Sequence, residues 1–261
     1  MLAQRNFPLV YASIAMPLIA GCGRSTTPEP IKWMAMPDEK VHMTFQLQQS
    51  SGKEVKGEAK VLFFKNFAVV ITYNPDARYG RNWDSFVVFD LEKMAWHENS
   101  TGDWVDVKVC QEWERDSIER DMSILPSVQD SATRDYIHAQ IEPHFQVRKD
   151  QDGTLTVFND FLKYEVRPEE KTTPYQRLRF DAYDRVSAYH KAMEERERPP
   201  IAQIALNDIL AKEKIIPKRL VATIKTANGD VVASVDITRE KFEIADAEYV
   251  ERSLATIKKQ P

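Results

Sequence analysis

The segment HAQIEPH contains the residues whose types and spacing come nearest to a metal site. It places His138, Glu142 and His144 close together in the chain. Imidazole and carboxylate groups bind zinc, and two ligands on one helix face, as in H-E-x-x-H, are a common start of such a site. Pro143 interrupts any helix between the two histidines. The spacing is therefore wrong for zinc, and we predict no metal site.

The rest of the chain offers no catalytic constellation. His97 and Glu98 are neighbours on a predicted strand, where consecutive side chains point to opposite faces, so they do not form an acid–base pair. The sequence has no G-x-S-x-G turn, no phosphate-binding loop and no G-x-G-x-x-G motif. We therefore predict no catalytic residue and no cofactor, and an enzyme is the third of three functional hypotheses.

The amino-terminal residues have the pattern of a secretion signal. Residues 1–21 carry one charge, Arg5, and residues 7–20 are apolar or small apart from Ser13 and two prolines. A membrane-spanning helix needs ~20 consecutive apolar residues, and this run is shorter and contains proline. A basic residue before the run and small residues after it are typical of a cleaved signal, here residues 1–21.

The end of this signal, Ile19-Ala20-Gly21-Cys22, resembles the lipobox of bacterial lipoprotein precursors. The resemblance implies that diacylglycerol alkylates the thiol of Cys22, that cleavage precedes Cys22, and that this residue carries the membrane anchor. It also implies a place in the bacterial cell envelope, facing the periplasm. Gly23, in place of Asp, favours the outer membrane over the inner one.

Composition restricts the partners. Removing residues 1–21 leaves 240 of the 261 residues, and the loss of Arg5 changes the net charge from −4 to −5. A mildly acidic chain lacks the basic face that nucleic acid requires, so no nucleic-acid partner is expected. With Cys22 lipidated, Cys110 has no disulfide partner, and we expect it to be a buried and inert thiol.

A Pro-containing tether, residues 22–39, precedes a single predicted domain, residues 40–261. Residues 41–48 alternate between apolar and polar side chains, which predicts a half-buried strand. Closely spaced strand patterns continue through WVDVKV, residues 104–109. Short connections allow only antiparallel pairing, so residues 41–109 predict a meander of five or six strands.

Helices and strands alternate in the remainder. Residues 110–142 predict two helices, with Pro126 and Ser127 as a break and an N-cap. Strands are predicted at residues 144–149, 154–159 and 161–167, and YQRLRF, residues 175–180, is read as a further strand. Helices follow at residues 182–196 and from Pro200, then a hairpin turning at Asn228-Gly229 and a last helix, residues 246–258, capped by Asp246.

Several strands are apolar on both faces, notably residues 62–64, 67–71 and 86–89. A sheet with one wet face would alternate, so these strands need cover on both sides. Helices can cover one face, and a second layer or an apolar ligand must cover the other.

The segments FQLQQSSGKEVKGEAKVLFFKN and FVVFDLEKMAWHEN resemble the opening strands of the lipoprotein-carrier and lipoprotein-receptor family, the LolA/LolB-like fold. The first matches as a hairpin with Gly57 opening its second strand. The second departs from the family, since Asp90-Leu91-Glu92 replaces an Asp-Gly turn and His97 replaces Tyr. The resemblance covers residues 41–100.

Together these patterns predict an α+β fold with a curved, half-barrel-like antiparallel sheet packed with helices, plus a carboxyl-terminal hairpin and helix. The resemblance implies an apolar cavity, and the candidates to line it are Phe63, Phe67, Val69, Ile71, Phe86, Val88, Phe89 and Trp96. The alternative is that the same residues only form core packing, as apolar stripes usually do. The first functional hypothesis is non-catalytic binding of an apolar or lipidated ligand. The alternative is an interaction lipoprotein that binds another envelope protein through the tether and the final helix.

Overall fold

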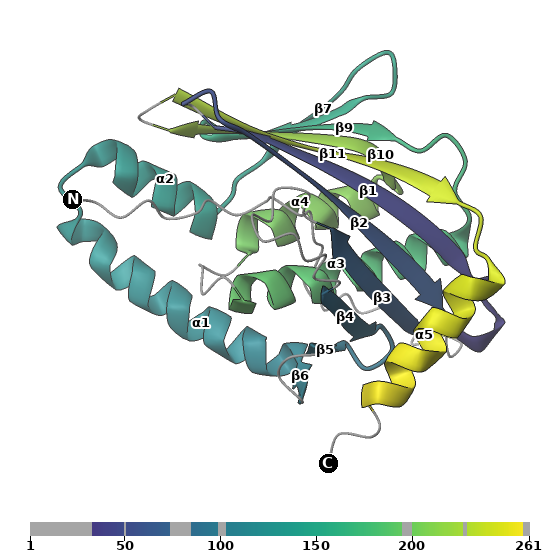
Figure 1. Cartoon of the computed structure of the whole chain (residues 1–261). Coiled ribbons are helices and arrows are strands. Elements are labelled where there is room, and N and C mark those ends of the chain that lie inside the picture. Colours follow the sequence, from purple (N-terminus) through teal and green to yellow (C-terminus); the bar gives the residue numbers. More distant parts are fainter. Residues whose placement is uncertain are drawn as a thin grey trace, which may run out of the picture.

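The computed structural model describes residues 33–49, 51–73, 85–98, 103–194, 200–226 and 229–257. The predicted signal, Cys22 and residues 22–32 of the predicted tether lie outside the described residues, as does Asn228. The described residues form an α+β fold in which helices pack on an open antiparallel sheet (Figure 1).

The sheet has eleven described strands in the order β6-β5-β4-β3-β2-β1-β11-β10-β9-β8-β7. Strands β1 to β6 follow one another as the predicted meander, and β11 pairs with β1 to join this half to the other. The strands are β1 (Glu39–Gln48), β2 (Glu54–Phe64), β3 (Phe67–Tyr73), β4 (Ser85–Asp90), β5 (Ala95–Glu98), β6 (Trp104–Asp106), β7 (Gln146–Lys149), β8 (Leu155–Phe158), β9 (Leu162–Pro168), β10 (Pro217–Thr226) and β11 (Gly229–Glu240).

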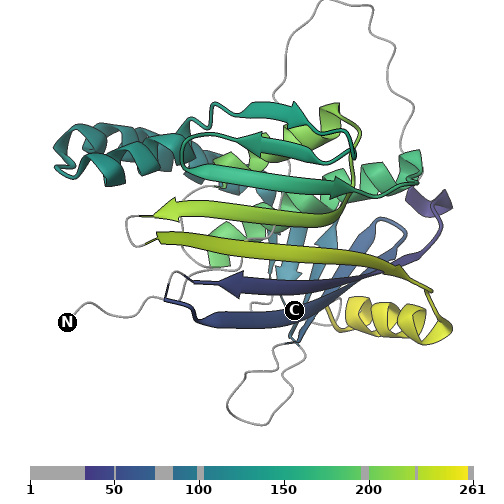
Figure 2. The same ribbon diagram turned by 90° about the horizontal axis from the view of Figure 1, so that it is seen from above.

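Helices cover both faces of this sheet. One face, which we call the concave face, packs against helices α1, α3 and α4, and the opposite, convex face carries α5 at one end (Figures 1 and 2). Helices α1 and α2 extend beyond the ends of the strands in both views. The helices are α1 (Val107–Ile124), α2 (Ser131–Ile141), α3 (Pro174–Glu194), α4 (Ile201–Lys212) and α5 (Ile244–Ile257), with short 3₁₀ turns η1 (Trp33–Ala35) and η2 (Leu125–Ser127).

The period-two pattern of β1 is confirmed. Val41, Met43, Phe45 and Leu47 are buried on the concave face, while the polar residues between them lie on the convex face. On β2 to β4 both sets are apolar, and both are covered, as the sequence predicts. The convex set packs against Val250 and Ile257 of α5, so the apolar face of this last helix is not free to bind a partner.

One predicted element, one boundary and one cap are wrong, and in each case a capping side chain accounts for the difference. The alternation of WVDVKV ends at Asp106, whose carboxylate accepts a hydrogen bond from the amide of Lys108 at 2.7 Å and begins α1. Residues 107–109 are therefore helical. Asp130, not Ser127, caps α2, since its carboxylate accepts from the amide of Thr133 at 2.8 Å.

The segment YQRLRF is the first part of α3 and not a strand. Thr173 and Gln176 form a reciprocal capping box, with Thr173 Oγ1 accepting from the amide of Gln176 at 3.2 Å and Gln176 Oε1 accepting from the amide of Thr173 at 2.8 Å. Asp246 has a similar role in α5, where its carboxylate accepts from the amide of Glu243, so α5 begins two residues before the predicted cap.

Of the two features taken from the family resemblance, the position of Gly57 is wrong and the departure after β4 is confirmed. Gly57 lies inside β2, opposite Phe45, because the strand already begins at Glu54. The missing Asp-Gly turn after β4 is replaced by Asp90, whose carboxylate accepts from the amides of Glu92 and Lys93 at 3.2 and 3.0 Å. The carboxyl-terminal hairpin pairs Thr226 with Gly229, and the predicted turn between them lies outside the described residues.

The end of the predicted tether packs on the domain. Trp33 and Met36 are buried in the same cluster as the concave face of β1 and β2. Arg179 of α3, 1% exposed, donates to the carbonyl oxygens of Pro37 and Lys65. Residues 33–37 are thus fixed to α3 and to the β2–β3 turn.

Candidate ligand-binding site

The eight predicted lining residues lie on two opposite faces of the sheet. Strand register puts Phe63, Phe89 and Trp96 on the concave face, where they belong to the cluster beneath α3. The other five pack beneath α5 on the convex face: Phe67, Val69, Ile71, Phe86 and Val88. A single cavity on one side of the sheet can therefore be lined by only one of the two sets.

An aromatic cluster on the concave face joins the sheet to α3. The ring of Tyr183 meets Phe63 and Phe89 edge to face, with centroids 5.7 Å apart in both pairs. Seven residues further along α3, His190 makes the same kind of contact with Phe89 and Trp96, at 5.5 and 5.6 Å. Residues seven apart share a helix face, so α3 presents both rings to the sheet. Such edge-to-face pairs add specificity to apolar burial.

The apolar surface continues along the concave face to the other half of the sheet. There, buried residues of β8, β9 and β10 pack against Ala202, Leu206 and Leu210 of α4. Side chains fill the interface near α3, where the hollow between Met43, Phe63 and Phe180 has a volume of about 10 Å³. That is barely the space of one water molecule. An apolar ligand on this face therefore requires the helices to move away from the sheet.

Polar side chains link α3 to both neighbouring helices, Tyr189 to Glu114 of α1 and Arg185 to Asp208 of α4. We call these four residues, together with Arg177, Asp181 and Asp184 of α3, the helix seam. Tyr189 Oη donates to Glu114 Oε2 at 2.5 Å, which links α3 to α1. Arg177 Nε lies 3.0 Å from Asp181 Oδ1, and its guanidinium also donates to the carbonyl of Ile215.

Burial raises the pKa of the carboxyl groups in the helix seam. The pKa of Asp184 is well above its usual value because the group is fully buried, and the neighbouring charge of Asp181 raises it further. Burial raises the pKa of Asp208 to about 6, against a smaller opposing effect of Arg185. Burial also raises the pKa of Glu114, and the hydrogen bond from Tyr189 partly offsets this.

Polar atoms in and beside the helix seam lack partners. Asp184 Oδ2 and Asp208 Oδ1 are buried without a hydrogen bond among the described residues, and so are both side-chain atoms of Asn207. Burying a polar group costs desolvation free energy, and without a partner no hydrogen bond compensates for it. The interface between these helices is therefore less stable than an apolar interface of the same size.

The structure brings the histidine cluster together at the surface. Glu142 Oε2 is 3.4 Å from His138 Nε2 and 3.9 Å from His144 Nε2, and the side chain of His144 is 87% exposed. Within the described ranges no group of three or more His, Cys, Asp or Glu side chains has the arrangement of a metal site. The three side chains form an exposed polar cluster.

Cys110 is buried, as the sequence predicts, although it lies in the first turn of α1 and not after a strand. Burial raises the pKa of its thiol to about 11, and the charges of Asp106 and Glu114 add to this effect. The thiolate that would act as a nucleophile is therefore scarce at neutral pH.

None of the described helices is both long and apolar enough to cross a bilayer. The sequence matches no protein-family model and no curated protein. Among solved structures, the chain is similar to the crystal structure of the LolA superfamily protein NE2245 from Nitrosomonas europaea. That alignment covers 80% of this chain and 88% of the other, at 7% sequence identity and a TM-score of 0.33.

Proposed function

We propose that this chain is a lipid-anchored envelope protein that binds an apolar or acylated ligand between the concave face of the sheet and helices α1, α3 and α4. Phe63, Phe89 and Trp96 line the ligand site in this proposal. The five residues beneath α5 are core. The chain itself performs no reaction in this account.

The helix seam is the observation that carries the proposal. The concave face is apolar from β5 to β9, which is a surface that favours burial against a ligand. The helices covering it carry buried carboxyl groups, and those of Asp184 and Asp208 each have an oxygen without a hydrogen-bond partner among the described residues. Separating the helices from the sheet returns these carboxyl groups to water, and their hydration is favourable. This offsets part of the free-energy cost of exposing the apolar surface until a ligand covers it.

The anchor is Cys22 in this proposal, and it is tested separately. Mass spectrometry of the native product from a bacterial host is expected to find an amino-terminal Cys22 carrying a diacylglyceryl thioether. An intact leader with an unmodified sulfur would remove the envelope assignment, but would leave the ligand site untouched.

The ligand site is tested with the full chain, purified in dodecyl maltoside. One half of the sample is extracted directly with organic solvent. The other half is unfolded in urea on the affinity column, washed and refolded before extraction. An apolar or acylated compound in near-stoichiometric amount in the first extract, and absent from the second, supports the proposal. Identical extracts contradict it.

A second candidate function, binding of another envelope protein, is favoured by exposed apolar side chains on α1. Val109, Met122 and Ile124 are 58%, 38% and 43% exposed, and α1 extends beyond the sheet (Figure 2). Scattered exposed apolar residues are common on monomers, so a discriminating variant is needed. If this candidate is right, the full chain captures a protein from solubilised membranes and Val109→Glu abolishes capture without loss of any bound lipid.

A further inference from the structure

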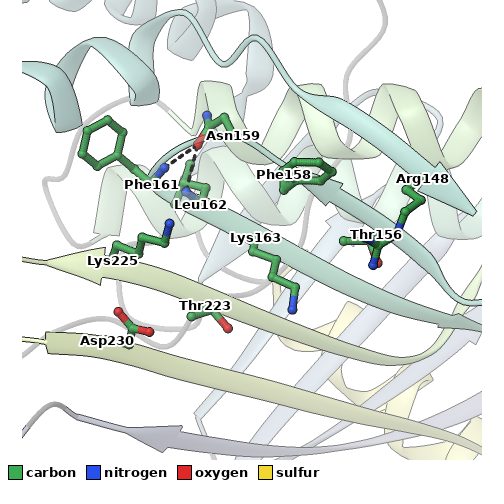
Figure 3. A pocket seen from close by; sticks show the side chains of 10 residues that line it. All are labelled: Arg148, Thr156, Phe158, Asn159, Phe161, Leu162, Lys163, Thr223, Lys225 and Asp230. Atoms are coloured by element: carbon green, nitrogen blue, oxygen red, sulfur yellow. Dashed lines mark hydrogen bonds between the residues drawn. The ribbon is translucent and has the colours of Figure 1, made fainter.

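A separate hollow lies on the convex face of the sheet, on the opposite side from the proposed ligand site. It has a volume of about 360 Å³ and is open to solvent. Its lining brings together three cations and an aromatic ring (Figure 3): Arg148, Lys163, Lys225 and Phe158, with Thr156 and Asp230.

Strand register explains why these side chains lie on one face of the sheet, with Arg148 and Thr156 at one end of the hollow and Lys225 and Asp230 at the other (Figure 3). Arg148 of β7 is opposite Thr156 of β8, and Phe158 of β8 is opposite Lys163 of β9. Directly opposed residues on antiparallel strands point to the same face, and their Cβ atoms are about 5 Å apart. Lys225 of β10 joins them from the next strand and is opposite Asp230 of β11.

Thr156 is the most informative residue of the hollow. It is 2% exposed, it lines the hollow, and its hydroxyl makes no hydrogen bond with any described residue. A buried hydroxyl without a partner is costly, and valine would fill the same space without that cost. The hydroxyl oxygen is itself covered, so a group that enters the hollow accepts a hydrogen bond from it only when the side chains above it move aside.

The lining itself carries three cations against the one carboxylate of Asp230, which favours an anion as that group, although two of the cations also have acidic neighbours. Arg148 Nε donates to Asp150 Oδ1 at 3.1 Å, and Lys163 Nζ is 3.0 Å from Glu165 Oε1. The fork of Arg148 leaves its terminal nitrogens for a further acceptor. The ammonium of Lys225 has no ion pair within the described ranges, even with Asp230 across the ladder.

We infer that this hollow binds a phosphate ester. The phosphate oxygens accept hydrogen bonds from Arg148, Thr156 and Lys163, the pairing that planar guanidinium, hydroxyl and ammonium groups make with phosphate. Lys225 contributes positive charge from the neighbouring strand. The ring of Phe158 packs against the carbon skeleton of the ligand. The cations are exposed and two have acidic neighbours, so binding is salt-dependent.

Such a phosphate can come from a soluble ester or from a phospholipid headgroup, and one titration distinguishes them. The full chain in dodecyl maltoside is titrated at low ionic strength with glycerol 3-phosphate, with dihexanoyl phosphatidylglycerol and with dihexanoylglycerol, and heats of binding are recorded. Thr156→Val is the test variant. Lys60→Gln, an exposed lysine on the convex face of β2, is the control.

Both phosphate compounds are expected to bind the wild type, and Thr156→Val is expected to weaken binding about tenfold, as loss of a hydrogen bond to a charged group predicts. The same variant is expected to unfold at a higher urea concentration, because it removes the unpaired hydroxyl. Lys60→Gln is expected to change neither the affinity for the phosphate compounds nor the urea concentration at which the chain unfolds. If phosphatidylglycerol binds, glycerol 3-phosphate does not, and Thr156→Val still weakens the binding, the natural source of the phosphate is a phospholipid headgroup.

Three results would overturn the inference: no binding of either phosphate compound, equal affinities for Thr156→Val and the wild type, or equal affinities for phosphatidylglycerol and for phosphate-free dihexanoylglycerol. The last compound also separates the two sites. Its binding would be independent of Thr156 if it occupies the concave face.

Discussion

Replacing Asp208 with asparagine should make the protein more stable at neutral pH. The pKa of Asp208 is about 6 in the folded protein, against an ordinary value of 3.8. Between these two pH values the folded chain holds a proton that the unfolded chain has lost. The stability from this difference is fully present below about pH 3.8 and is lost as the pH rises through 6. Asparagine resembles the protonated form of the side chain at every pH, so the variant keeps this stability at neutral pH.

The magnitude follows from the pKa and the burial of the group. A displacement of about two pH units corresponds to about 3 kcal/mol for a group shielded from water. Asp208 is only half-buried, and screening by solvent reduces the expected gain to about 1 kcal/mol at pH 7. The charge of Arg185 faces Asp208 from α3 and already opposes the effect of burial.

The assay is urea unfolding of the full chain, followed by tryptophan fluorescence from pH 5 to pH 7.5. The free energy of unfolding of Asp208→Asn should exceed that of the wild type by a margin that grows with pH and levels off above pH 6. Asp135→Asn, an exposed aspartate on α2, is the matched control and should show no such growth. A variant that is no more stable than the wild type at pH 7.5 would refute this account of the helix seam.

Three further predictions concern the core, the thiol and a helix cap. Ile216→Ala should cost about 2–5 kcal/mol of unfolding free energy, whereas Ile244→Ala, at a residue 81% exposed, should cost under about 0.5 kcal/mol in the same urea titration. Cys110, whose pKa is raised to about 11, should resist iodoacetamide at pH 8 in the folded chain and react once urea unfolds it, as peptide mass spectrometry would report. Asp130→Ala should lower the thermal unfolding midpoint through a loss of about 1 kcal/mol, and Ser127→Ala should lower it less if Asp130 is the cap.

Local patterns in the sequence were sufficient to predict much of the sheet. The alternation at Val41, Met43, Phe45 and Leu47 identifies β1 and its buried face without any knowledge of the partners. The runs that are apolar on both faces predict cover on both sides, which α3 and α5 provide. These features follow from backbone periodicity alone.

Helix boundaries were predicted less well, because short-range hydrogen bonds compete with apolar patterns. The alternation in WVDVKV continues past Asp106, yet this carboxylate begins a helix. The signal that would have corrected YQRLRF was present upstream, since Thr173-Pro174 followed by Gln176 is a capping box with proline at the first helical position. Propensity alone did not reveal it.

The functional features needed long-range geometry. The helix seam depends on how α3 lies against α1 and α4, and the cationic hollow depends on strand order and register across β7 to β10. No local pattern connects Glu114 with Tyr189, whose hydrogen bond forms only through tertiary packing, and none places Arg148 and Lys225 in the lining of one hollow. Sequence reasoning also assigned eight lining residues to one cavity, since period two separates the faces but does not say which face a ligand would use.

The most direct test of the proposed ligand site is photo-crosslinking in living cells, with p-benzoylphenylalanine placed at single tyrosines of the full chain. Tyr183 contacts Phe63 and Phe89 on the concave face, Tyr249 contacts Phe86 beneath α5, and Tyr175 is 52% exposed. Each variant is first checked for an unfolding transition like that of the wild type. The account predicts an adduct with an apolar or acylated molecule at Tyr183 and none at Tyr249 or Tyr175. A folded Tyr183 variant without an adduct, or with an adduct only at Tyr249, would contradict it.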